Sequence, residues 1–379
     1  MDFELDTEQE ALRDAVRRLL TSAYSSIDGR REATAKDPGF DEQMWRRLAE
    51  MGVLGLPFAE ADGGMGAGPV EVALVAEQVG RCLAPEPFVE AVVLSGGLVA
   101  AAGTAQQRSR LLGGLATGDL VPAFAHTEPL AGRHPGPASV TATRDGDGWL
   151  LDGVKEPVPG GARADVLVVS AAVDGRTGLF VVEPDAAGLD RVGYPTYDGG
   201  RAARVSFAAT PATPLGDAGT DAAPLVERVL ADARVAYCHE AVGAMDAALT
   251  MTTEYLRTRK QFGVPLRTFQ ALTFRAADMY VSLELARSLA LWATLVLADG
   301  DDAVTAADRA CVQVGLAGRH IGQEAIQLHG GIGMTAEYAV GHYTARLTTI
   351  AHLVGHSDEH LARLATRVRD HGAVDPLEA

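Results

Sequence analysis

The hydrophobic pattern changes character twice along the chain. Over residues 7–117, apolar side chains recur at spacings of three and four, for example at Leu12 and Val16, and this predicts amphipathic helices. Thr7 followed by Glu10 predicts a capping box at the start of the first helix. The first third of the chain is therefore expected to be helical.

Short β-prone segments follow from about Leu120. Their ranges are 139–143, 149–151, 166–169 and 179–182. These runs are rich in Val, Leu, Thr and Phe, and Asp145-Gly146-Asp147-Gly148 supplies a hairpin turn between the first two. The pattern predicts an antiparallel β domain in the middle of the chain.

Helical periodicity returns at Ala223 and continues to about His371 in long Ala- and Leu-rich segments with few breakers, which is typical of a helix bundle. The predicted class is α+β. The predicted domains are a helical domain over 1–119, a β domain over 120–222 and a helix bundle over 223–379.

One glycine-rich stretch, Gly63-Gly64-Met65-Gly66-Ala67-Gly68, invites comparison with a dinucleotide-binding fingerprint. That fingerprint needs a strand before it and a helix after it, whereas this stretch follows a helical segment. We interpret it as a loop between helices.

Composition narrows the function classes. The chain has 379 residues, 47% hydrophobic and 22% charged, and its net charge of -17 argues against nucleic acid or an anionic membrane as a partner. Cys82, Cys238 and Cys311 are far apart in sequence and form no CxxC, so neither a disulfide framework nor a metal site is predicted. The N-terminus lacks a signal pattern and no uninterrupted apolar run reaches about 18 residues, so a cytoplasmic location is expected.

Four segments resemble motifs of the acyl-CoA dehydrogenase family, in the family's order. They are Leu56-Pro57 with Gly63–Gly66, Thr127-Glu128-Pro129, Arg259-Lys260-Gln261-Phe262-Gly263, and Gln327-Leu328-His329-Gly330-Gly331-Ile332-Gly333. The resemblance covers nearly the whole chain, and the last two segments are the most specific. It implies a helical N-terminal domain, a β middle domain, a C-terminal four-helix bundle, FAD as cofactor, and α,β-dehydrogenation of an acyl-CoA thioester.

The resemblance also implies which residues bind the cofactor. They are Arg259, Gln261, Phe262, Gln270, Gln327, Gly330 and Gly331. In the family these positions reach across a subunit interface to the adenosine half of a neighbour's FAD. The residue types suit that role, because an arginine fork matches a pyrophosphate, an aromatic ring can pack on adenine or ribose, and paired glycines let the backbone approach a ligand closely.

Two family features are missing. After the Leu151–Lys155 element the family usually carries a Trp and a Ser or Thr that contact the flavin ring, but this chain reads Glu156-Pro157-Val158-Pro159. The position of the catalytic Glu falls on Val354 or Gly355, and the alternative position, before Arg234, is Ala233. None of these can take a proton, so no catalytic residue is assigned in this chain.

Titratable residues close in sequence to the two base positions are expected to be solvated or on helix surfaces. They are Asp232, Glu240, His352, His356, Asp358 and Glu359.

The chain keeps the residues for the adenosine half of the FAD site but lacks those that would contact the flavin ring and the catalytic base. This combination predicts the base-less subunit of an α2β2 heterotetramer, whose partner subunit supplies the Glu. Actinobacterial-type enzymes that resemble this often act on steroid-derived acyl-CoA in lipid catabolism. Two alternatives stay open: a self-sufficient flavoenzyme with a non-standard base, and a flavin-free structural or regulatory subunit.

Overall fold

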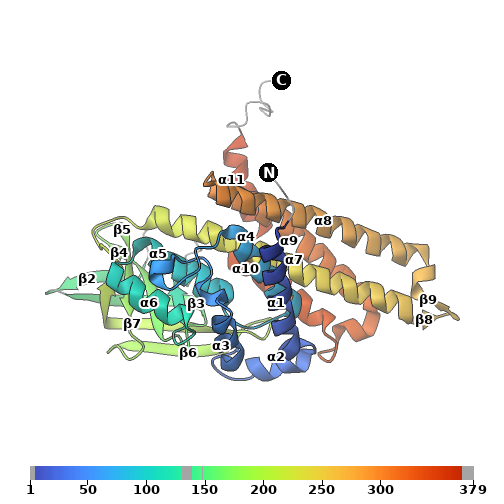
Figure 1. Ribbon diagram of the computed structural model, residues 1–379, viewed down its shortest axis with the longest axis horizontal. Coiled ribbons are helices and arrows are strands. Elements are labelled where there is room, and N and C mark those ends of the chain that lie inside the picture. Colours follow the sequence, from blue (N-terminus) through green and yellow to red (C-terminus); the bar gives the residue numbers. More distant parts are fainter. Residues whose placement is uncertain (1–4, 130–138, 147, 369–379) are drawn as a thin grey trace.

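The computed structural model describes residues 5–129, 139–146 and 148–368. Helices come first, a β-sheet follows, and helices return to the end of the described chain. The sheet forms one end of an elongated molecule, the long C-terminal helices extend to the other end, and the N-terminal helices pack across the middle (Figure 1).

The N-terminal region is helical, as predicted. Its elements are α1 (Thr7–Tyr24), α2 (Ile27–Thr34), α3 (Glu42–Glu50), the 3-10 turns η1 (Val53–Gly55) and η2 (Glu60–Asp62), α4 (Pro69–Cys82), the π-helix η3 (Phe88–Gly96), α5 (Gly97–Ala102) and α6 (Ala105–Ala116). The segment 63–68 is a loop between η2 and α4, which confirms that interpretation.

The predicted capping box of α1 was wrong by one residue. The N-cap is Asp6, whose carboxylate accepts hydrogen bonds from the backbone N–H groups of Glu8 and Gln9 at 2.9 and 2.8 Å. The Gln9 side chain accepts the Asp6 N–H in return at 3.1 Å. Asp6 caps better than Thr7 because a carboxylate accepts two N–H groups and also complements the helix dipole.

The middle region is a single seven-stranded sheet. Its strands are β1 (Pro122–Ala125), β2 (Thr141–Asp145), β3 (Gly148–Pro159), β4 (Val166–Val173), β5 (Arg176–Val182), β6 (Leu189–Pro195) and β7 (Arg201–Pro214). Six strands follow the order β1-β4-β2-β3-β7-β5, the seventh, β6, pairs with β7, and a further β4–β5 pairing closes the path. The core of the sheet includes Leu151, Phe180 and Val205, which are fully buried.

The sheet is mostly antiparallel, including the predicted β2–β3 hairpin. The prediction of a purely antiparallel sheet was wrong at two pairings, because β4 runs parallel to both β1 and β2. The chain leaves β1, forms the hairpin and returns beside its starting edge, a long-range connection that local alternation does not encode. Asp147, in the middle of the predicted turn, lies outside the described residues.

The C-terminal region is the predicted bundle. Its elements are α7 (Ala223–Thr258), the hairpin strands β8 (Lys260–Gln261) and β9 (Val264–Pro265), the 3-10 turn η4 (Leu266–Thr268), α8 (Gln270–Asp299), α9 (Ala303–His329), the 3-10 turn η5 (Gly330–Met334), α10 (Val340–Val354) and α11 (Ser357–Thr366). Helix α9 packs against α7, α8, α10 and α11. Within this core the Sγ atoms of Cys238 and Cys311 lie 3.8 Å apart as free thiols.

Helix α7 joins the bundle to the N-terminal helices by a very close crossing with α4. A Cβ atom at Gly80 would overlap the carbonyl oxygen of Glu240, and one at Gly243 would overlap the carbonyl oxygen of Glu77. The two backbones are therefore in direct contact, and only glycine fits at these two positions.

Within the described part of the chain, one helix, α8, is long and apolar enough to cross a membrane by length and composition, and 33% of its most apolar window is buried in the chain. Core helices of soluble proteins meet the same criterion, and α8 packs along α7 and α9. We therefore treat it as a bundle helix with an exposed apolar side.

Candidate functional site

A cavity of about 460 Å³ lies where α7 and α9 end, beside the β8–β9 hairpin and η5. Five of the seven residues predicted to bind a cofactor line it: Arg259, Gln261, Gln327, Gly330 and Gly331. Two motifs far apart in the sequence thus form one site. We call it the adenosine cavity, after the half of FAD that the resemblance assigns to these residues.

The other two predicted residues do not line the adenosine cavity. Phe262 and Gly263 have φ angles of 53° and 82°, as a tight hairpin turn with two left-handed residues requires, and this turn points the Phe262 side chain outward. Phe262 is 93% exposed and makes an edge contact with Phe269 at 6.2 Å between ring centroids. Gln270 is exposed at the start of α8. Both residues remain proposals for contacts with a ligand held partly by another chain.

The electrostatics of the adenosine cavity favour an anionic group. Arg259 is exposed and forms no ion pair with any described residue, whereas Arg275, on the same wall, is bound bidentately by Glu324 at 2.5 and 2.9 Å. A Cβ added at Gly330 or Gly331 would meet no atom within 4 Å, so this backbone is open to a ligand. A free guanidinium beside an open backbone suits a pyrophosphate.

His329 lines the same cavity, although no role was predicted for it. Its Nδ1 donates to the carbonyl oxygen of Ala325 at 2.7 Å, which leaves Nε2 as a buried acceptor without a partner. Its ring packs against Tyr255 and Tyr338, with centroids 4.6 and 4.9 Å away, and burial lowers its pKa. The fixed Nε2 suits a ribose hydroxyl donor. Its place in the Gln-Leu-His-Gly-Gly motif was the signal available in the sequence.

A second, smaller cavity lies where the resemblance would place a flavin ring. It is lined by Leu94, Phe124, His126, Thr127, Pro157, Pro159, Leu230, Ala233, Arg234, Tyr237 and Leu353, and we call it the ring cavity. Its volume is about 70 Å³, far below the roughly 300 Å³ at which pockets for larger organic ligands begin. Pro157 and Pro159 offer no backbone N–H, and no carboxylate is among the lining residues described.

The polar groups of the ring cavity are fixed by their surroundings. His126 Nδ1 is 2.9 Å from Ser170 Oγ, and its pKa falls to about 3 because of burial and the nearby Lys155. His126 Nε2 and Arg234 Nη1 are buried without partners. The cavity therefore presents fixed nitrogen groups and apolar walls, and its described lining offers neither a carboxylate nor room for three fused rings.

The Thr127-Glu128-Pro129 motif has a structural role here. Glu128 accepts hydrogen bonds from Lys155 Nζ at 2.6 Å and from the Ser139 and Val140 N–H groups at 2.6 and 3.0 Å. Burial alone would raise the pKa of Glu128, but these donors bring it down to about 2. The motif thus anchors the start of β2 to β3.

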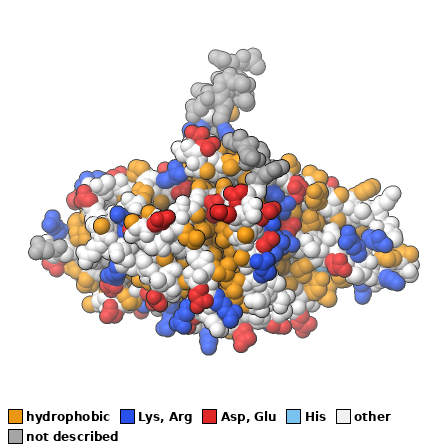
Figure 2. Space-filling view, viewed as in Figure 1, with side chains coloured by type: hydrophobic (Ala, Val, Ile, Leu, Met, Phe, Trp, Pro, Cys, Tyr) orange, Lys and Arg blue, Asp and Glu red, His pale blue; other side chains and the backbone are white. Residues whose placement is uncertain are grey.

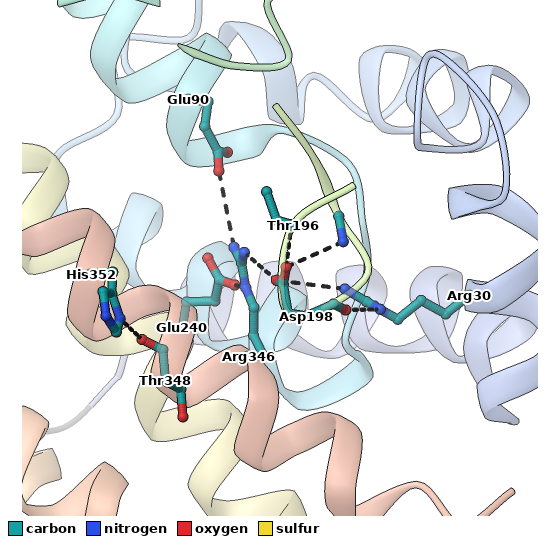
Figure 3. A network of polar contacts seen from close by, with 9 residues as sticks. Arg30, Glu90, Thr196, Asp198, Glu240, Arg346, Thr348 and His352 are labelled. Atoms are coloured by element: carbon teal, nitrogen blue, oxygen red, sulfur yellow. Dashed lines mark hydrogen bonds and ion pairs between the residues drawn. The ribbon is translucent and has the colours of Figure 1, made fainter. Parts of the chain in front are cut away.

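None of the substitute bases lines the ring cavity. Asp232 pairs with Arg228 at 3.2 Å, and Glu240 pairs with Arg346 at 2.6 Å. His352 Nδ1 bonds the Thr348 carbonyl oxygen, and Figure 3 shows its ring apart from the charged groups around Arg346. His356 packs edge-on against His352, while Asp358 and Glu359 lie in the first turn of α11. Contrary to expectation, Glu240 is not on a helix surface, because it is 2% exposed.

Glu240 belongs to a buried charge network that joins all three regions of the chain (Figure 3). Arg346 on α10 donates to Glu240 on α7 at 2.6 Å and to Asp198, between β6 and β7, at 3.0 Å. Its guanidinium is also 4.0 Å from Glu90 on η3. Arg30 on α2 donates to the Asp198 carbonyl oxygen at 2.7 Å.

Glu86, close to this network, predicts a pH-dependent stability. Tyr24 Oη donates to Glu86 Oε1 at 2.5 Å, yet burial, with a smaller contribution from Asp41, raises the Glu86 pKa from 4.5 to about 7. The folded chain therefore holds a proton that the unfolded chain releases. The free energy of unfolding is expected to fall by up to about 3 kcal/mol as pH rises from about 4.5 through 7.

Urea unfolding at a series of pH values measures this slope. Glu86→Gln should flatten the profile, whereas Glu50→Gln, at an exposed position on α3, should leave it unchanged. Equal slopes for both variants would show that Glu86 is not the group responsible.

Comparisons with known proteins bear on the whole chain. The family models for the N-terminal and C-terminal domains of acyl-CoA dehydrogenases match residues 6–119 and 223–369. Acyl-CoA dehydrogenase FadE12 of Mycobacterium tuberculosis is 33% identical over 324 residues, covering 82% of this chain and 84% of the relative. The chain belongs to the acyl-CoA dehydrogenase family.

Other acyl-CoA dehydrogenases are also similar to this chain in sequence or in structure. FadE27 of M. tuberculosis is 29% identical over 373 residues, covering 90% of this chain and 92% of the relative. A variant of the steroid acyl-CoA dehydrogenase Tcur3481-Tcur3483 matches with a TM-score of 0.87 and 32% identity, covering 97% of this chain and 99% of that one. The ChsE4-ChsE5 complex of M. tuberculosis matches with a TM-score of 0.88 and 26% identity, with the same coverage. These matches confirm the predicted acyl-CoA dehydrogenase fold.

The cofactor of this acyl-CoA dehydrogenase family is FAD. The residues of this chain fit one half of it. The adenosine cavity offers a free guanidinium, amide groups and open glycine backbone, whereas the ring cavity is too small for the flavin rings.

Proposed function

We propose that this chain is the base-less subunit of an α2β2 acyl-CoA dehydrogenase. It binds the adenosine half of an FAD whose ring is held by the partner subunit, and the partner also supplies the catalytic carboxylate. The observation that carries the proposal is the contrast between the two cavities. The adenosine cavity is open and cationic, while the ring cavity has about 70 Å³ and no carboxylate among its described lining residues.

The role of this chain follows from its own groups. Arg259 would neutralise the pyrophosphate, Gln261 and Gln327 would bond polar atoms nearby, and Gly330-Gly331 would admit the ligand to the backbone. FAD held there would supply the hydride acceptor for dehydrogenation of the acyl thioester. Ala233 offers no group for the α-proton, so that proton must pass to the partner subunit.

The exposed hydrophobic side chains of this chain also support a partner subunit. Most of the exposed large hydrophobic side chains lie in the C-terminal region: Phe262, Val264, Phe274, Tyr280, Val281, Leu285, Leu316, Ile332, Met334 and Leu361. Figure 2 shows hydrophobic side chains at the surface over this half of the molecule, on the right of the view. Apolar surface gathered around the adenosine cavity and along α8 is typical of a protein interface.

Two similar structures support the subtype and the substrate class. One is described as a steroid acyl-CoA dehydrogenase named for two chains, and the other as a complex of two chains. We therefore propose an acyl-CoA thioester with a steroid side chain as the substrate. Activity is expected only in the heteromer.

The test is to purify this chain alone and again together with an acyl-CoA dehydrogenase chain that carries the Glu, and to measure flavin absorbance per chain and molecular mass. We expect little flavin alone and one FAD per unlike pair in a mixed tetramer. A yellow homomer that reduces its flavin with an acyl-CoA would contradict the proposal and favour a self-sufficient enzyme. A mixed tetramer whose FAD content is unaffected by Arg259→Ala would favour a structural subunit.

A further inference from the structure

A third cavity lies where the three regions of the chain meet, and we call it the junction cavity. It is lined by Arg30, Pro38, Gly39, Phe40, Leu83, Ala84, Pro85, Glu86, Pro87, Glu90, Val121, Pro122, Pro159, Gly160, Arg163, Thr196, Asp198, Gly200, Arg201, Arg346, Thr349 and Leu353. Its volume is about 90 Å³, which accommodates a few waters or one molecule of about five or six non-hydrogen atoms. Pro159 and Leu353 separate it from the ring cavity, because both line the two spaces.

Three polar atoms on the walls of the junction cavity are buried without partners: Arg30 Nε, Glu86 Oε2 and Thr349 Oγ1. Arg30 is 5% exposed and Glu86 is 3% exposed. Buried polar atoms in native proteins nearly always have a hydrogen-bond partner, so three unmet atoms around one small space point to a molecule that fills it.

The unmet atoms are held rigidly because the rest of each group is engaged. Arg30 Nη1 donates to the Asp198 carbonyl oxygen at 2.7 Å, and Glu86 Oε1 accepts the Tyr24 hydroxyl. Arg163, which also lines the cavity, is exposed and forms no ion pair with a described residue. The free Arg163 guanidinium at the exposed side calls for an anion. The unmet Arg30 Nε–H inside calls for a hydrogen-bond acceptor, since the charge of Arg30 is already paired with Asp198 at 3.8 Å.

We propose that the junction cavity binds a small 2-hydroxycarboxylate. The carboxylate accepts from Arg30 Nε and faces Arg163, while the hydroxyl donates to Glu86 Oε2 and accepts from Thr349 Oγ1. Above about pH 7, where Glu86 is ionised, a simple carboxylate would leave Glu86 Oε2 without a donor, and a simple alcohol would leave the Arg163 guanidinium without an anion. This site is distinct from the adenosine cavity and does not depend on FAD.

The probe pair is glycolate and acetate, which carry the same charge and differ by the hydroxyl. In thermal unfolding of the chain or complex above about pH 7, where Glu86 is ionised, we expect millimolar glycolate to raise the midpoint and acetate at equal concentration to have a clearly smaller effect. Thr349→Val removes one hydroxyl with little change in volume and should weaken glycolate binding about fivefold. Thr348→Val is the matched control, because the Thr348 hydroxyl bonds the Thr344 carbonyl oxygen on the exposed side of α10.

Two results would overturn the proposal. One is an equal effect of glycolate and acetate on the unfolding midpoint, which would indicate a general ionic effect. The other is a crystal structure grown in glycolate that shows only waters bridging Arg30, Glu86 and Thr349. The comparison of the two probes needs no variant, so it holds even if Thr349→Val folds poorly.

Discussion

Replacing Arg259 by alanine is expected to remove most of the FAD from the assembled complex. The guanidinium lies in the adenosine cavity without a carboxylate partner among the described residues, so its donors are free for a pyrophosphate. Two hydrogen bonds to a charged group contribute about 3 to 6 kcal/mol, and even the lower value corresponds to more than a hundredfold in the dissociation constant. Flavin absorbance per complex after gel filtration measures the loss, and titration of the apo complex with FAD measures the affinity.

Arg267→Ala is the matched control for this experiment. Arg267 lies eight residues further on, is exposed on η4 and does not line the adenosine cavity. It should leave FAD content and affinity unchanged. An equal loss of FAD in both variants would indicate a general effect of charge, and no loss in either would show that the cofactor does not contact Arg259.

The largest effect on stability is expected from Arg346→Met. This change leaves three carboxylates, Glu90, Asp198 and Glu240, close together in the interior without the guanidinium that they share. Removing one partner of a buried ion pair typically costs about 3–5 kcal/mol, because the remaining charge stays buried without compensation. Equilibrium unfolding in urea measures the loss.

The control is Arg110→Met, which breaks the exposed pair of Arg110 with Glu183 and should cost less than about 1 kcal/mol. Adding Glu240→Gln to Arg346→Met should recover part of the stability, because it removes one of the unpaired charges. If Arg346→Met costs no more than Arg110→Met, the network does not contribute to holding the three regions together.

The sequence was sufficient for the helical elements, and it named five residues that the structure brings to one cavity, while their contacts with a cofactor stay a prediction. Spacings of three and four predicted the helices, and two motifs at the ends of α7 and α9 predicted Arg259, Gln261, Gln327, Gly330 and Gly331. A motif predicts a site well when its residues lie together on the chain, because local backbone geometry then brings them to one place.

The remaining features depend on contacts between distant parts of the chain. The charge network joins five residues from four helices and one loop, and no spacing in the sequence encodes that meeting. They are Arg30, Glu90, Asp198, Glu240 and Arg346. The Phe262 side chain points outward because Phe262 and the next residue both have positive φ angles. A positive φ is uncommon for residues other than glycine, so the sequence does not predict it at Phe262. The volume of the ring cavity likewise depends on how side chains from distant segments pack, and the spacing of hydrophobic residues along the sequence does not predict that packing.

The crossing of α4 and α7 at Gly80 and Gly243 has a consequence for synthesis of the chain. The surface of α4 around Gly80 is covered by α7, which leaves the ribosome only after the whole sheet has been made. The N-terminal helices cannot bury that surface while they are nascent, and they wait as an incomplete unit with apolar groups exposed. Contacts between segments so distant in sequence also slow folding. We therefore expect the helical N-terminal region to mature last and together with the bundle, although it is the first region to be translated.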